Sequence, residues 1–98
     1  MIYRIHNKCR SNIVRFYKGV AKKYKYTYSE ELMLKNIDDA TNGMFLIEKT
    51  LHRRKPTLTR WKNQGWHMAN TDKWYYAYTI DGDTITIQDA CHAQNMHD

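Results

Sequence analysis

The sequence predicts an α+β domain in which a strand and two helices precede a three- or four-stranded antiparallel meander, with the helices packed on one face of the sheet. Two observations predict this class. Apolar residues recur at helical spacing between residues 8 and 51, whereas residues 66–87 are rich in aromatic and β-branched side chains around an Asp-Gly turn. The chain has 98 residues, which is enough for one small core, so residues 1–98 are predicted to form a single domain.

The N-terminal part is predicted to contain a short strand and a basic amphipathic helix. The strand covers residues 1–6, and the helix runs from about Lys8 to Tyr26. Its apolar residues follow the i, i+3, i+4, i+7 rule at Ile13, Phe16, Tyr17, Val20 and Tyr24. Its other face carries the cations Arg15, Lys18, Lys22, Lys23 and Lys25.

A second, longer helix is predicted between Ser29 and Pro56. Ser29 is a typical N-cap residue, and acids follow it in the first turn, where the helix dipole favours negative charge. Apolar residues then repeat every three or four positions at Met33, Ile37, Ala40, Met44, Ile47 and Leu51. Because this stripe passes through Asn42-Gly43 in register, we expect one helix, which ends before the proline.

The C-terminal part is predicted to form the meander. Trp61, Trp66 and Met68 have the spacing of extended chain, so Arg60 and Lys62 are expected at the start of the sheet. Two β-preferring runs, residues 74–80 and 84–87, flank an Asp-Gly turn, which is the strongest hairpin signal in the chain.

The aromatic residues of the first run fall on two faces. Trp74, Tyr76 and Tyr78 share one face of the strand, and Tyr75 takes the other. Most of these rings must fill the core of so small a domain, whereas rings on a solvated face would be able to stack on unpaired bases. Periodicity alone leaves open which face is solvated.

The charge of the chain is segregated along its length. The formal net charge is +6, but residues 1–28 carry eight Lys or Arg and no acid, and residues 52–62 carry five bases and no acid. The intervening and following segments are acidic. This pattern is typical of a protein that binds a polyanion through two basic segments, although a solvated helix face would also carry such charges.

Composition also argues against several classes. No apolar stretch approaches the ~18 residues of a membrane span, and residues 1–6 are too polar for a signal-peptide core. The two cysteines, Cys9 and Cys91, do not make a disulfide framework, so a cytoplasmic location is expected. No paired Cys or His spacing of a zinc site occurs, and we expect neither a metal nor a cofactor.

Two segments carry a resemblance to a known family. Residues 72–83, Asp-Lys-Trp-Tyr-Tyr-Ala-Tyr-Thr-Ile-Asp-Gly-Asp, are similar to the aromatic hairpin of the RelE/ParE toxins of bacterial toxin–antitoxin pairs. Residues 90–97, Ala-Cys-His-Ala-Gln-Asn-Met-His, resemble the closing pattern of that family, Gly-His-Arg followed by Tyr or His. Ala93 stands where the family often has Arg, and His67 and Tyr75 also stand where Arg is usual.

The resemblance implies a toxin that cleaves mRNA in the ribosomal A site and is silenced by a cognate antitoxin. Metal-free cleavage of RNA needs a base for the 2′-OH, an acid for the leaving oxygen and a fixed cation at the phosphate. Histidine suits both proton roles near neutral pH, and arginine suits the third. The catalytic candidates are His92, His97, His67 and Arg60.

The candidates for RNA or phosphate binding are His52, Arg53, Arg54, Lys55, Lys62 and Lys73. We expect the end of the long helix and Arg60 to lie beside the same concave sheet face as His67 and His92. Each histidine also has a purely structural interpretation, for example His52 as a favourable charge near a helix C-terminus. Two other functions stay open, a ParE-like inhibitor of DNA gyrase and a non-catalytic nucleic-acid-binding domain.

Overall fold

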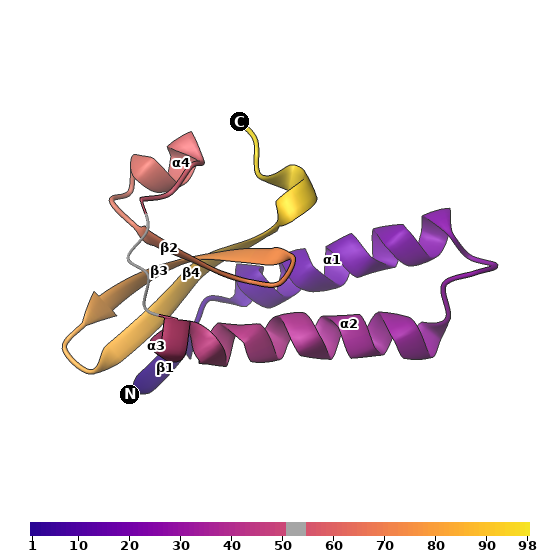
Figure 1. Cartoon of the computed structure of the whole chain (residues 1–98), viewed down its shortest axis with the longest axis horizontal. Helices are drawn as coiled ribbons and strands as arrows, with labels where there is room; N and C mark the ends of the chain where they lie inside the picture. Colours follow the sequence, from indigo (N-terminus) through magenta and orange to yellow (C-terminus); the bar gives the residue numbers. More distant parts are fainter. Residues whose placement is uncertain (51–54) are drawn as a thin grey trace.

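The computed structural model describes residues 1–50 and 55–98, and these form a layer of two long helices on one face of a four-stranded sheet, with a short helix on the other face (Figure 1). The helices and 3₁₀ turns are α1 (Asn7–Lys23), α2 (Glu30–Gly43), η1 (Met44–Leu46), α3 (Ile47–Thr50), α4 (Thr59–Lys62) and η2 (Ala93–Asn95). The strands are β1 (Ile2–Ile5), β2 (His67–Thr71), β3 (Trp74–Asp81) and β4 (Thr84–His92). The predicted α+β class is therefore confirmed.

The sheet is mixed rather than wholly antiparallel. Its order is β1-β4-β3-β2, and the predicted meander of β2, β3 and β4 is antiparallel. The first strand adds to this meander in parallel with β4, with Ile2 opposite Thr84 and Ile5 opposite Ile87. This placement makes β4 a central strand, because the α1–α2 hairpin carries the chain away and the last strand returns beside the first.

Both long helices begin at capping side chains. The Ser29 hydroxyl accepts a hydrogen bond from the Leu32 N–H at 3.1 Å, as the sequence predicts. His6 caps α1 in the same manner, because its Nδ1 accepts from the Lys8 N–H at 3.2 Å. The first helix ends at Lys23, before the expected Tyr26, and the chain turns there into a loop with the sequence Tyr-Lys-Tyr-Thr-Tyr at residues 24–28.

The second helix changes character at Gly43, where the sequence predicts an uninterrupted helix. α2 ends at this glycine, a 3₁₀ turn follows, and α3 then continues in the same direction (Figure 1). A Cβ on Gly43 would lie 2.5 Å from the Thr71 Oγ1 and 2.8 Å from the Tyr76 Oη. The Tyr76 hydroxyl donates to the Ala40 carbonyl at 2.6 Å, so the glycine lets the helix approach β2 and β3 closely.

Each face of the sheet has its own apolar cluster. The face under α1 and α2 buries Ile13, Ile37, Trp74, Tyr76 and Tyr78 among others, so these aromatic rings are core residues. The opposite face carries a smaller cluster of Leu58, Trp61, Met68, Ala77 and Cys91, with Tyr75 packed against it. The predicted division of aromatic residues between two faces is confirmed, and both faces are covered.

The segment around Arg60 is a helical turn, and the expectation that it starts the sheet is wrong. α4 covers Thr59–Lys62, and the first residue of the next strand is His67. Leu58 and Trp61 are three residues apart, so one turn of helix points both into the smaller apolar cluster. Their burial against the sheet decides the local conformation.

A β-bulge in β4 determines which residues face the helices. Tyr78 pairs with Ile87 and Ala77 pairs with Asp89, so Gln88 is the additional residue. Before the bulge, Ile85 and Ile87 face α1. After it, Ala90 and His92 take that face, while Asp89 and Cys91 turn toward α4.

A pair of glycine substitutions tests the close approach of α2 to the sheet. Gly43→Ala is expected to lower the free energy of unfolding by about 1–3 kcal/mol, because its methyl group would collide with Thr71 and Tyr76. Gly19→Ala is the control, since a Cβ there meets nothing within 4 Å and an alanine in a helix is worth about 0.5–1 kcal/mol over glycine. Urea denaturation measures both, and equal effects would contradict the packing argument.

Candidate functional site

A cleft at the C-terminal end of β4 brings together side chains from α1, α4 and the sheet. It has a volume of about 320 Å³. The lining residues that bear on its chemistry are Asn12, Arg15, Phe16, Arg60, His92 and Asn95. Two of the predicted catalytic residues, Arg60 and His92, therefore share one cleft.

The imidazole of His92 is held from three sides. It stacks on the Phe16 ring, with centroids 4.0 Å apart and planes 14° apart, and meets the Trp74 ring edge-on at 5.4 Å. Its Nδ1 accepts a hydrogen bond from the Gln94 N–H at 3.1 Å. In the neutral imidazole the proton is thus on Nε2, which is the nitrogen left to donate.

The environment favours the neutral form of His92. Burial lowers the pKa of the imidazole below 6.5, and the nearby Lys73 ammonium lowers it further, against an opposing attraction from Asp72. The hydrogen bond to Nδ1 acts in the same direction, because a protonated ring would present an N–H to the Gln94 N–H. His92 is therefore a neutral hydrogen-bond donor at physiological pH.

The arginines of the cleft differ in their surroundings. The Arg60 Nε lies 3.7 Å from the Asp89 Oδ2, and its guanidinium lies 5.8 Å from the centroid of the Trp61 ring. Arg15 is exposed and forms no ion pair within residues 1–50 and 55–98. The cleft thus has one anchored and one unneutralised guanidinium, which is an arrangement that suits a phosphate.

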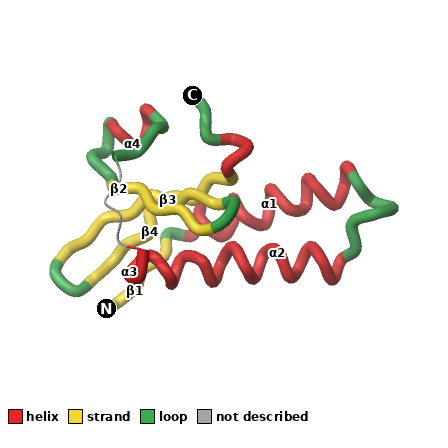
Figure 2. Tube along the Cα trace, viewed as in Figure 1, coloured by secondary structure: helices red, strands yellow, loops and turns green. Residues whose placement is uncertain are grey.

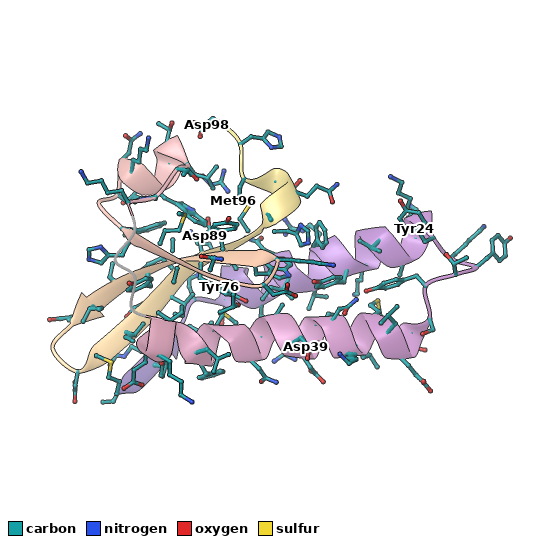
Figure 3. All side chains as sticks on the ribbon, viewed as in Figure 1. Tyr24, Asp39, Tyr76, Asp89, Met96 and Asp98 are labelled. Atoms are coloured by element: carbon teal, nitrogen blue, oxygen red, sulfur yellow. The ribbon has the colours of Figure 1, made fainter. Side chains whose placement is uncertain are left out.

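Asp89 lies on β4, on the side of the sheet that faces α4 (Figure 3). Its Oδ2 accepts from the Trp61 Nε1 at 2.8 Å, and its Oδ1 accepts from the Asn12 Nδ2 at 3.0 Å and from the Ala90 N–H at 2.9 Å. It is 7% exposed and is the one charged side chain buried in the described part of the chain. These bonds tie α1 and α4 to β4.

The C-terminal tail returns to α4 (Figure 1). The Asp98 carboxylate accepts from the Thr59 N–H at 2.9 Å and from the Thr59 hydroxyl at 2.7 Å, and these bonds lower the pKa of Asp98. Asn95 lines the cleft, and the exposed His97 lies between these two anchored positions. The tail therefore keeps His97 on the side of the molecule that carries Arg60.

His67 does not join the other candidates. It pairs with Tyr78, whereas His92 pairs with Trp74, four residues away on β3. Both histidines lie on the face of the sheet that the helices cover, because their partners Tyr78 and Trp74 both face the helices. Four residues of strand span about 13 Å, however, so the strand register keeps His67 away from the cleft that His92 lines.

The predicted phosphate-binding residues are divided. The turn between β2 and β3 is a short loop (green in Figure 2). Lys73 lies in this turn beside His92, and its carbonyl accepts the Ala93 N–H at 2.7 Å. Lys55 and Lys62 are exposed and do not line the cleft. His52, Arg53 and Arg54 lie outside the described residues.

Sequence reasoning missed three residues of the cleft. Arg15 reads as one of several cations on a solvated helix face, Phe16 reads as core, and Asn12 has no signal of its own. Their spacing in the sequence shows only that the three lie within about one turn of the same helix. They reach the site because α1 contacts β4, where Asn12 bonds to Asp89, 77 residues later in the chain.

Neither cysteine is activated as a nucleophile. Burial raises the pKa of the Cys9 thiol to about 12 and also raises the pKa of the Cys91 thiol, although Arg60 opposes the latter shift. Among the described residues, no three His, Cys, Asp or Glu side chains are grouped as metal ligands. The chemistry available in the cleft is that of imidazole, guanidinium and amide groups.

Two comparisons with known proteins identify no family for this chain. No family model matches the sequence, and no curated protein is significantly similar to it. None of the helices in the described ranges has the length and apolar character needed to cross a bilayer.

Removal of the buried carboxylate tests whether Asp89 holds the cleft together. Asp89→Ala is expected to lower the free energy of unfolding by about 2–4 kcal/mol, because the Trp61 and Asn12 donors lose their acceptor. Asp39→Ala removes an exposed ion pair with Lys35 and should cost less than about 0.5 kcal/mol. Chemical denaturation of both variants measures the difference, and similar losses would contradict this role.

The lowered pKa of His92 predicts a pH-dependent contribution to stability. In the unfolded chain this imidazole takes up a proton near pH 6.5, whereas the folded protein resists it until a lower pH. The stabilising contribution of the neutral ring is therefore present above about pH 6.5 and is lost as the pH falls toward the lowered pKa. The gap in unfolding free energy between wild type and His92→Gln should shrink between pH 7.5 and 5, and a constant gap would refute this.

Proposed function

We propose that this chain is a toxin of the RelE/ParE type that cleaves mRNA as a metal-free endoribonuclease. The observation that carries the proposal is the cleft in which Arg15, Arg60 and His92 meet. Such a cleft offers two guanidinium groups and one imidazole, which are groups that stabilise the negative charge developing on a phosphodiester during its cleavage. The resemblance of residues 72–97 to the toxin family supports the same function.

The two arginines bind the scissile phosphate. Arg60 is anchored by Asp89 at 3.7 Å, but the carboxylate is already engaged by three N–H donors, so the guanidinium keeps donors for a ligand. Arg15 reaches the cleft from α1 without an acidic partner in the described part of the chain. Together they stabilise the negative charge that develops on the phosphorane.

The two histidines have different roles. His92 has Nδ1 occupied by the Gln94 N–H, so its neutral ring donates the Nε2–H as a hydrogen bond to a non-bridging oxygen of the phosphorane. His97, exposed on the tail that Asp98 anchors to α4, takes the proton of the 2′-OH, and solvent water protonates the leaving 5′-oxygen. The products are a 2′,3′-cyclic phosphate and a free 5′-hydroxyl.

The proposal includes a biological setting. A cleft this small and open orients its substrate only weakly, which favours cleavage of mRNA held by the ribosome. A cognate antitoxin silences the toxin in the cytoplasm, as the family resemblance implies. His67 has no place in the proposed mechanism, since it lies about 13 Å along the sheet from His92 and does not line the cleft.

Mapping of new RNA ends tests the proposal. The chain is expressed briefly under tight control, and 5′ ends on an abundant mRNA are mapped by primer extension. Cuts restricted to translated sequence are expected, whereas cuts outside reading frames would indicate a ribonuclease that does not need the ribosome. Growth arrest without new ends would contradict nuclease activity and favour inhibition of gyrase, and no arrest would favour a binding domain.

Variants of the cleft test the assigned roles. Arg15→Gln and His92→Gln are expected to reduce the yield of cut ends at least tenfold, because each removes a group worth about 10²-fold or more in phosphoryl chemistry. Arg4→Gln is the matched control, since Arg4 is exposed on β1, outside the cleft. Thermal melts of each variant exclude unfolding as the cause. If Arg15→Gln and Arg4→Gln give the same yield of cut ends, Arg15 has no role in the mechanism.

A further inference from the structure

A second cavity lies between the α1–α2 hairpin and the β2–β3 turn, and its walls are aromatic. Its volume is about 580 Å³, within the range of about 300–1,000 Å³ typical of small-molecule sites. The rings that line it are Phe16, Tyr17, Tyr24, Tyr28, Trp74 and His92. Although His92 lines it, the proposed mechanism places no part of the substrate in this cavity.

Hydrogen bonds and ring contacts hold the walls in place. The Trp74 Nε1 donates to the Tyr17 hydroxyl at 2.9 Å, and the Asn36 Nδ2 donates to the Tyr28 hydroxyl at 2.6 Å. Phe16 contacts the Trp74 ring with centroids 5.6 Å apart. A cavity with such fixed walls loses little conformational entropy when a flat ligand enters.

Polar groups stand at two sides of the aromatic walls. Asn36 and Asp39 line the cavity from α2, and Lys73 lines it from the β2–β3 turn, close to His92. Flat aromatic walls with amide and carboxylate groups suit the face and the hydrogen-bonding edge of a nucleobase. The lysine supplies a cation for the phosphate attached to that base.

The aromatic cavity and the phosphate-binding cleft share a wall. Phe16, Trp74 and His92 line both of them. A nucleotide whose phosphate lies between Arg15 and Arg60 would therefore have a base-sized, aromatic cavity on the other side of His92. The adjacency is the reason to favour a nucleotide over an unrelated apolar ligand.

We propose that the aromatic cavity binds the nucleobase of a nucleotide next to the phosphate held in the cleft. The identity of the ligand rests on the proposed function, but its binding requires no cleavage. Tyr24 and Tyr28 form the outer wall, on the loop between α1 and α2, and stack on the base. Tyr26, on the same loop, is 90% exposed and does not line the cavity.

Binding of uncleavable nucleotides to the full chain tests the proposal. The probes are the four deoxynucleoside 3′-monophosphates, and deoxyribose 5-phosphate is the probe without a base. NMR titration follows the indole N–H of Trp74 in the cavity wall, with that of Trp66, in the cluster on the opposite face, as reference. At least one nucleotide is expected to bind tenfold or more tightly than the sugar phosphate and to shift the Trp74 signal.

Two tyrosine variants give the matched comparison. The double variant Tyr24→Leu, Tyr28→Leu keeps apolar bulk but removes the stacking surface, and it should weaken nucleotide binding by about tenfold or more. Tyr26→Leu should change binding by less than about twofold. If the double variant fails to fold, Tyr24→Leu alone serves, because Tyr24 is half-exposed and its loss leaves the core intact.

The outcomes separate this proposal from the proposed function. Nucleotides that bind no more tightly than the sugar phosphate would overturn the base-binding cavity even if mRNA is cut. Equal losses in Tyr26→Leu and the cavity variant, or a shift at Trp66 alone, would also overturn it. Selective loss of nucleotide binding in the cavity variant would support it even in a chain that cuts no RNA.

Discussion

The hydrogen-bonded carboxylate of Asp89 is the interaction on which the rest of the structure depends. A buried charge is costly unless its oxygens find donors, and Asp89 finds them on Asn12 of α1, on Trp61 of α4 and on its own strand. These bonds join the helical layer to the cluster on the opposite face of the sheet. They also hold Arg60 beside the end of β4, so the same carboxylate that supports the fold positions a cation of the cleft.

The bulge at Gln88 gives this carboxylate its position and His92 its neighbours. β1 ends at Ile5, opposite Ile87, and the chain then continues into α1. Beyond Ile87 this edge of β4 is therefore open to Asn12, whose side chain donates to the Ala90 carbonyl. The additional residue reverses the alternation, which places His92 against Phe16 and Trp74. His92, together with Phe16 and Trp74, thereby forms the wall between the arginine-lined cleft and the aromatic cavity, and both proposals depend on that placement.

Local signals in the sequence were sufficient for most of the secondary structure. The Ser29 cap, the Asp-Gly turn at Gly82 and the apolar stripe through Ile37, Ala40 and Met44 all correspond to observed features, because each depends on near neighbours in the chain. Arg60 and His92 were also identified as members of one site. His67 lies away from the cleft for a non-local reason, since only the pairing of strands sets it about 13 Å from His92 along the sheet.

The sequence by itself determined the order of the elements, the α+β class and the segregation of basic charge, because periodicity and capping are short-range properties. The tertiary structure decided which elements contact one another. β1 and β4 pair in parallel although 80 or more residues of sequence separate them. Gly43 permits α2 to approach Thr71, and α4 forms because Trp61 is buried. The bulge decided the most, since a shift of one residue exchanges the faces of a strand and thus determines that His92, and not Cys91, packs against Phe16 of α1.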